Sequence, residues 1–227
     1  MTLSLVAADP VAGECGVAVM SSSPAVAARC AHVRPGVGAV ASQNVTDPRL
    51  GPLLLSRLAE GAEPEAAVHA VVVAQPADVI AYRQLVAVDL DGRTAIHSGE
   101  HALGVVGEAV GPAAASAGNL LAAPDVPDRA RGGHEAGQGA LAERLLVGLE
   151  AGVAAGGEAG PVRSAGLVVG RDGVGWPVVD LRVDWDDDDP VGRLRELWER
   201  WQPELEGYVT RGLRPGEAPS FGVPGDE

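Results

Sequence analysis

The most informative absence in this chain of 227 residues is lysine, because all 17 basic residues are arginine. Without lysine the chain cannot form a lysine Schiff base, has no P-loop lysine and has no lysine general base. Arginine stays protonated, so it can bind anions but is a poor proton acceptor. Mechanisms that depend on a lysine are therefore excluded.

Cysteine is scarce as well, since Cys15 and Cys30 are the only two. They cannot build a disulfide framework or a four-cysteine zinc site. We expect both to be reduced and half-buried rather than redox-active or nucleophilic. His97 and His101 are four residues apart but lie beside a predicted strand, not on a helix, and His134 shares no ligand spacing with them. We expect no metal and no cofactor.

No basic stripe offsets the net charge of -14, so we do not expect nucleic acid as a partner. An anionic membrane surface would repel the chain, and no run approaches the ~20 apolar residues of a membrane helix. The N-terminus also lacks the basic and apolar regions of a signal peptide. We therefore expect a cytoplasmic protein.

The length and composition favour one globular domain. Hydrophobic residues make up 46% and charged residues 21% of the chain, as in ordinary globular proteins. Aromatic residues make up only 3%, so valine, alanine and leucine must fill the core. We predict a single domain over residues 1–214 and a flexible tail over residues 215–227, where Pro and Gly are frequent.

Most of the expected strands are joined by short turns. Residues 2–8 and 15–21 predict an antiparallel hairpin that begins at the second residue of the chain. Residues 82–89 and 93–98 predict another, with its turn at Asp91-Gly92. Further strands are expected at residues 36–41, 105–110, 163–169 and 177–183.

Helices are expected in separate blocks: residues 47–59, a helix from Pro64, residues 138–151 and residues 190–202. Gly132-Gly133 and Gly156-Gly157 are predicted to be loops. This order predicts an α+β fold in which two antiparallel sheets lie face to face with helices outside them. An α/β fold of the Rossmann type fits poorly, because neighbouring strands pair through short turns.

Several segments match one family in order. The chain opens Met-Thr-Leu-Ser-Leu-Val-Ala, and Gly16 to Val19 is followed by Ser21. Later matching segments are Gly36 to Gln43, a loop with Thr46, Pro48 and Gly51, then Arg83-Gln84, Gly118 to Leu121, Leu141 to Leu146 and Val179 to Val183. Over roughly residues 1–200 the set resembles the bacterial family called domain of unknown function 1028, a branch of the N-terminal-nucleophile (Ntn) hydrolase superfamily.

The resemblance implies a four-layer αββα sandwich and hydrolysis of an amide bond. Removal of Met1 would leave Thr2 with a nucleophilic hydroxyl and an α-amine of pKa about 8 that can act as the base. Taken without the resemblance, Thr2 is simply the first residue of a strand, where threonine is common. The chain departs from the family at Ser22, where a basic residue is usual, and at Leu50, where tyrosine is usual.

Several polar residues are candidates for binding the substrate or the oxyanion. Gln43, Asn44 and Asn119 offer amide N–H groups to a developing oxyanion, or each ties down its own loop. Ser4 and Ser21 are expected in the same neighbourhood of the sheet, where they either hydrogen-bond the α-amine, an interpretation favoured for Ser21, or satisfy the sheet edge.

Three further candidates carry charge or titrate near neutral pH. His32 is expected to contact substrate or shuttle a proton, or to be a loop histidine with no role. Asp180 and Arg182 alternate on one strand and so face the same side. They form an ion pair under the nucleophile, bind a substrate carboxylate or make a purely structural salt bridge.

These observations leave hypotheses from different classes. The first is an amidohydrolase that cleaves a small-molecule or peptide-like amide through an acyl-Thr2 ester. The second is a binding or regulatory protein that keeps the fold but lacks catalysis. A third is an assembly subunit, and we expect a homo-oligomer because Ntn folds commonly associate through their helix layers. The substrate does not follow from the fold.

Overall fold

Two antiparallel sheets form the centre of the computed structural model, which describes residues 2–223. From edge to edge, the larger sheet contains β10 (Pro177–Val183), β9 (Ser164–Arg171), β2 (Glu14–Ser21), β1 (Thr2–Asp9), β8 (Ala114–Asn119) and β7 (Gly107–Gly111). The smaller sheet contains β3 (Ala31–Arg34), β4 (Gly38–Asn44), β5 (Arg83–Asp89) and β6 (Thr94–Ser98). The first strand of the chain therefore lies inside the larger sheet, paired on both sides.

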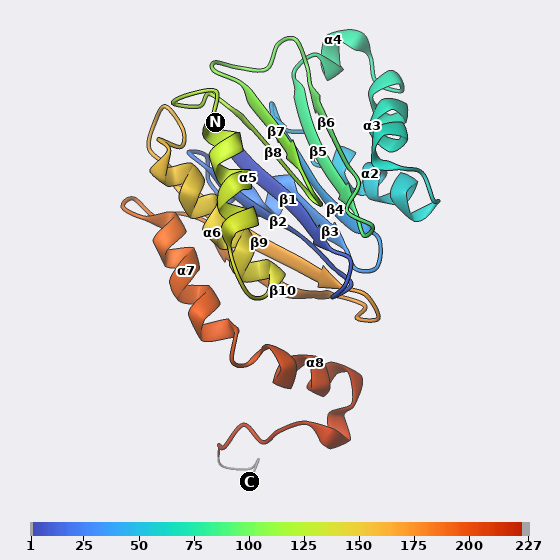
Figure 1. Cartoon of the computed structure of the whole chain (residues 1–227), viewed down its shortest axis with the longest axis vertical. Coiled ribbons are helices and arrows are strands. Elements are labelled where there is room, and N and C mark those ends of the chain that lie inside the picture. The colour runs from blue at the N-terminus through green and yellow to red at the C-terminus, as the bar shows by residue number, and fades with distance from the viewer. Residues whose placement is uncertain (1, 224–227) are drawn as a thin grey trace.

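Helices pack on the outer faces of the sheets (Figure 1). The larger sheet is covered by α5 (Val126–Ala136), α6 (Leu141–Ala154) and α7 (Pro190–Trp201). The smaller sheet is covered by α2 (Leu50–Ala59) and α3 (Pro64–Val73). The short α1 (Val26–Cys30) packs at the side of the sheets, and α4 (Ala77–Ile80) precedes β5. This arrangement confirms the predicted α+β fold of two antiparallel sheets with helices.

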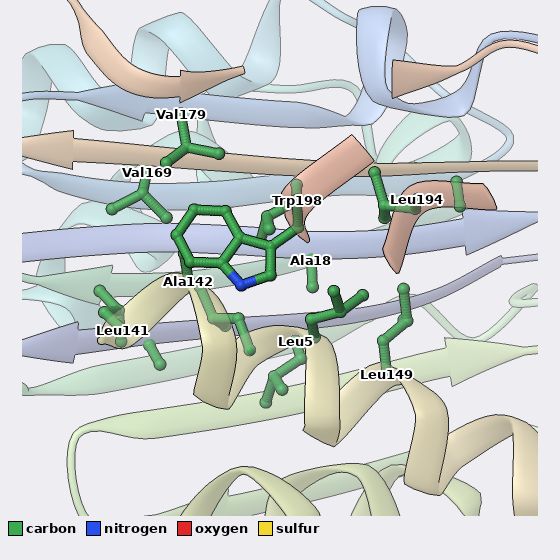
Figure 2. Packing of buried hydrophobic residues seen from close by; sticks show 14 of the residues in the cluster. Leu5, Ala18, Leu141, Ala142, Leu149, Val169, Val179, Leu194 and Trp198 are labelled. Atoms are coloured by element: carbon green, nitrogen blue, oxygen red, sulfur yellow. The ribbon is translucent and has the colours of Figure 1, made fainter. Parts of the chain in front are cut away.

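Three apolar clusters hold these elements together. One lies between the larger sheet and its helices, where Trp198 of α7 packs among Leu5, Val169 and Leu141 (Figure 2). A second fills the space between the two sheets with small residues such as Val17 and Ala41, and a third lies between the smaller sheet and its helices. Valine, alanine and leucine dominate all three, as the scarcity of aromatic residues requires.

The two predicted hairpins are confirmed. β1 pairs with β2 in a register that places Leu3 opposite Met20, and β5 pairs with β6. Gly92, in the second turn, has a φ of 85 degrees, a left-handed conformation that favours glycine. The remaining predicted strands appear as β4, β7, β9 and β10, with ends shifted by a few residues.

One loop prediction is wrong. Gly132 and Gly133 lie inside α5, not in a loop. A Cβ at Gly133 would come within 2.5 Å of the Ala151 side chain on α6. The glycine pair thus allows two helices to pack closely, and this benefit outweighs its low helix propensity.

The last described segments lie beyond the edge of the larger sheet (Figure 1). α8 (Leu205–Leu213) is followed by a short 3-10 helix at Pro215–Glu217. The guanidinium of Arg211 lies over the rings of Tyr208 and Phe221, so residues after 214 contact α8. Within residues 2–223, no helix combines the length and apolarity needed to cross a bilayer.

Candidate active site

Thr2 lies where the apolar layer between the two sheets becomes polar. On β1, Leu3 and Leu5 face the helices while Val6 and Ala8 face the other sheet. Because side chains alternate along a strand, Thr2 and Ser4 also face the other sheet. The same alternation on four neighbouring strands places Ser21, Asn119, Gln43 and Gln84 in the same layer, and all of these side chains are buried. We call this group of six the polar end.

The nearest neighbours of Thr2 come from the two strands that flank it. Asn119 of β8 pairs directly with Thr2, and the register of β2 brings Ser21 to its other side. The hydroxyl oxygens of Thr2 and Ser21 are 3.4 Å apart. Thr2 is only 4% exposed, so its hydroxyl lies in a desolvated, strongly hydrogen-bonding environment.

A line of hydroxyls connects Thr2 to a cation. Ser21 Oγ lies 2.8 Å from Ser23 Oγ and accepts the Ser23 backbone N–H at 3.1 Å. Arg29 of α1 donates to Ser23 Oγ at 2.8 Å and to the Pro24 carbonyl at 2.7 Å. The line therefore ends at a guanidinium that two hydrogen bonds hold in place. Ser22 is not basic in this chain, but Arg29 brings a cation to the same region.

Three buried amides join the two sheets beside Thr2. Gln43 Nε2 donates to Gln84 Oε1 at 2.7 Å and to the Ala117 carbonyl at 3.0 Å. Gln84 Nε2 donates to the Gly118 carbonyl at 3.2 Å. Asn119 Nδ2 donates to Gln84 Oε1 at 3.1 Å. The polar end therefore tethers β4 and β5 of one sheet to β8 of the other.

The two backbone carbonyls fix which way each amide points. Each carbonyl can only accept, so the nitrogen of Gln43 or Gln84 must face it. The oxygen of Gln84 then faces Asn119, which in turn must present its nitrogen. Gln43 Nε2 uses both hydrogens in this arrangement, whereas Asn119 Nδ2 keeps one for another acceptor. Of the predicted oxyanion donors, Asn119 is the one that pairs directly with Thr2 across the strands.

A carboxylate that sequence reasoning missed also reaches this region. Glu158 lies between α6 and β9, is buried, and accepts the backbone N–H of Ser22 at 3.0 Å. Burial raises the pKa of its carboxyl to about 7, although the positive charge at the N-terminus and hydrogen bonding from Ser22 lower it in part. Nothing in the spacing around Glu158 signals this placement, which depends on the path of the chain after α6.

Asn44 lies on β4 next to Gln43 but has a different environment. Its Nδ2 donates to the Tyr82 carbonyl at 2.6 Å, and its Oδ1 accepts the Leu103 N–H at 3.3 Å. Its φ of 74 degrees is left-handed, a conformation that asparagine tolerates. These contacts hold the loop after β4, and they correspond to the loop-tying interpretation of this residue.

His32, Asp180 and Arg182 lie together, but away from Thr2. They line a pocket of about 460 Å³ between the edge strands β3 and β10. Asp180 and Arg182 form a two-point ion pair of 2.8 and 2.9 Å. Three strand spacings separate β10 from β1, or about 14 Å. The structure therefore assigns these residues to a separate surface pocket.

The two cysteines are buried in the apolar cluster between the two sheets. Burial raises the pKa of the Cys15 thiol to about 12 and also raises that of Cys30. Thiols of this kind are protonated at neutral pH and are poor nucleophiles. The hydroxyl of Thr2 is therefore a better candidate nucleophile than either cysteine.

Comparisons with known proteins agree with this architecture. The model of a family described as "Family of unknown function (DUF1028)" matches residues 2–194. Among solved structures, the crystal structure of protein SPO2555 from Silicibacter pomeroyi, described with the same family, has a TM-score of 0.80. It is 30% identical to this chain, and the match covers 88% of each chain. A comparison with curated proteins gave no match.

Proposed function

The chain belongs to the DUF1028 family, and we propose that it is an Ntn amidohydrolase that acts through Thr2 after removal of Met1. The observation that carries the proposal is the position of Thr2. A β-hydroxy residue near the start of the chain lies inside the larger sheet, at the polar end of the inter-sheet layer. The succession of helices, sheet, sheet and helices supports an Ntn-type αββα arrangement.

The proposed reaction uses two groups of the same residue. The α-amine of Thr2 takes the hydroxyl proton as the oxygen attacks the amide carbonyl carbon. The second hydrogen of Asn119 Nδ2 stabilises the oxyanion. As the tetrahedral intermediate collapses, the C–N bond breaks and the ammonium returns its proton to the leaving amine. Water then hydrolyses the acyl-Thr2 ester, and the substrate is a small-molecule or peptide-like amide.

Covalent labelling tests the nucleophile without knowledge of the substrate. Protein from the native host is analysed by intact mass, then treated with a hydroxyl-acylating β-lactone probe, and the adduct is mapped by peptide sequencing. We expect a mass without Met1 and one adduct, on residue 2. Thr2→Ala should abolish the adduct and leave the melting temperature nearly unchanged, whereas Thr2→Ser should keep it.

Ser4→Ala is the matched control for this experiment. Ser4 is a buried hydroxyl on the same strand and the same face, two residues from Thr2. Its replacement should leave the adduct in place. A retained Met1, or equal labelling of the Thr2→Ala variant, would instead favour the second hypothesis, a binding or regulatory protein that lacks catalysis.

A further inference from the structure

Glu158 has one carboxylate oxygen that the fold satisfies and one that it does not. The side chain is 5% exposed, and its Oε2 accepts the Ser22 N–H at 3.0 Å. Its Oε1 is fully buried, and no residue in the described part of the chain donates a hydrogen bond to it. A buried carboxylate oxygen without a donor is costly and rare in native proteins. Its presence beside the candidate site indicates a functional partner.

The backbone around Glu158 crosses the start of β1. On one side, Gly157 O accepts from Ala122 N at 3.0 Å and Ala159 N donates to Leu120 O at 2.9 Å, both just after β8. On the other side, the Glu158 side chain reaches Ser22, just after β2. β1 lies between β8 and β2 and pairs with both. The segment therefore spans the gap in which Thr2 begins its strand.

We propose that, in the chain that begins with Thr2, the Glu158 carboxylate binds the α-amine through Oε1 and holds it beside the Thr2 hydroxyl. This inference rests on the proposed function. Glu158 is then a positioning residue, because its carboxylate contacts the α-amine and not the substrate. When the amine takes the hydroxyl proton it becomes an ammonium, which the adjacent carboxylate stabilises. Glu158 itself keeps its charge, and the proton passes from the ammonium to the leaving amine.

The electrostatics of the region fit such a pair. Burial raises the pKa of the Glu158 carboxyl, and the positive charge at the N-terminus lowers it in part, as expected of a carboxylate near the α-amine. By the same attraction, the α-amine should titrate above its usual value of about 8. Other charged or titratable groups near the gap are Arg29, which donates to Ser23 Oγ, Cys30 of the same helix, and Arg163, whose backbone N–H donates to Ser21 O and whose side chain pairs with Asp187. A substitution at residue 158 leaves all of them in place.

The absence of lysine makes the amine directly measurable, because the α-amine is the only primary amine in the chain. The chain starting at Thr2 is released from an N-terminal ubiquitin-like fusion. It is then labelled with trinitrobenzenesulfonate, which reacts only with the neutral amine, and the rate is followed against pH. We expect Glu158→Gln to lower the pKa of the amine by about 1 unit. Labelling at pH 6 should then be about 10-fold faster than in the unsubstituted chain.

Glu14→Gln is the matched control. Glu14 is also a buried glutamate, but it lies at the opposite end of β2 and pairs with Arg171 at 2.9 Å. Its replacement should leave the amine pKa unchanged. Glu158→Asp keeps the charge on a shorter side chain and should give an intermediate shift; it decides the question if Glu158→Gln does not fold.

The outcomes separate this inference from the proposed function. An amine pKa that is unchanged or raised in folded Glu158→Gln overturns the contact, even if Thr2 is acylated by the β-lactone. A lowered amine pKa in a chain that the β-lactone never acylates supports the contact and removes the catalytic role of Thr2. A chain that keeps Met1 in its native host overturns the proposed function alone, because the amine pKa is measured on the chain released at Thr2.

Discussion

Replacing Gln84 with leucine should destabilise the protein by about 3 kcal/mol, because this side chain is the hub of the polar end. Its Oε1 accepts from Gln43 and Asn119, and its Nε2 donates to Gly118 O and to Ser98 Oγ at 2.8 Å. Leucine leaves these buried groups without that partner, at about 1–3 kcal/mol for each group left unsatisfied. Better burial of the apolar side chain offsets part of the loss.

The assay is urea unfolding at pH 7, followed by circular dichroism, with the slope m compared between variants. Gln43→Leu alone should cost about 1–2 kcal/mol, since it leaves Ala117 O without its side-chain donor. The double variant should cost at least 1 kcal/mol less than the two single losses together, because two leucines pack against each other. Two results would refute a central role of Gln84 in this network. One is a double-variant loss within about 0.5 kcal/mol of the sum of the two single losses, and the other is a Gln84→Leu loss below 1 kcal/mol.

Other predictions concern the rest of the fold. His134 is 3% exposed and burial lowers its pKa to about 4; the unfolded chain therefore binds the proton more tightly. The free energy of unfolding should therefore fall by about 3 kcal/mol as pH drops from 6.5 toward 4, and His134→Gln should lack this fall. Urea unfolding that shows the same pH dependence of stability in both proteins would contradict the prediction. Trp198→Ala should cost about 3–5 kcal/mol in urea unfolding, because it empties the largest buried side chain of the helix-covered cluster; a loss below 1 kcal/mol would contradict this packing. The Asp180–Arg182 pair is about 40% exposed, so Arg182→Ala should cost less than 1 kcal/mol. β-lactone labelling of Thr2 should persist in that variant, and its loss would return Arg182 to the catalytic site.

The elements with strong local signals could be predicted from the sequence. The first hairpin and the hairpin through Asp91-Gly92 have alternating or apolar strands around a defined turn. β8 was not predicted, although it pairs directly with β1. Its sequence, Ala-Ala-Ser-Ala-Gly-Asn, contains no β-branched or aromatic residue. Small side chains there make room for the glutamines of the other sheet, which is a tertiary requirement with no local signature.

The residues of the candidate site also divide into those that the sequence indicates and those that only the tertiary structure brings in. Thr2, Ser21, Gln43 and Asn119 were selected from the sequence through the family segments, and the structure brings them together. Glu158 was not, because it stands alone in a Gly- and Ala-rich segment and reaches the site only through contacts made after β2 and β8. Arg29 likewise follows from the turn between β2 and α1, whose geometry a linear reading does not give.

Under the proposed function, the burial of Thr2 inside a paired strand implies a time limit on the removal of Met1. During synthesis the first strand leaves the ribosome more than a hundred residues before β8 and the Glu158 segment exist to enclose it. We infer that an aminopeptidase would have access in that interval and would lose it once the larger sheet is complete. We expect that a Met1-containing chain, folded first and then given methionine aminopeptidase, stays untrimmed, whereas trimming of the folded chain would contradict this. Met1 would then be removed only during synthesis, and a molecule that folds with Met1 in place would stay catalytically inactive.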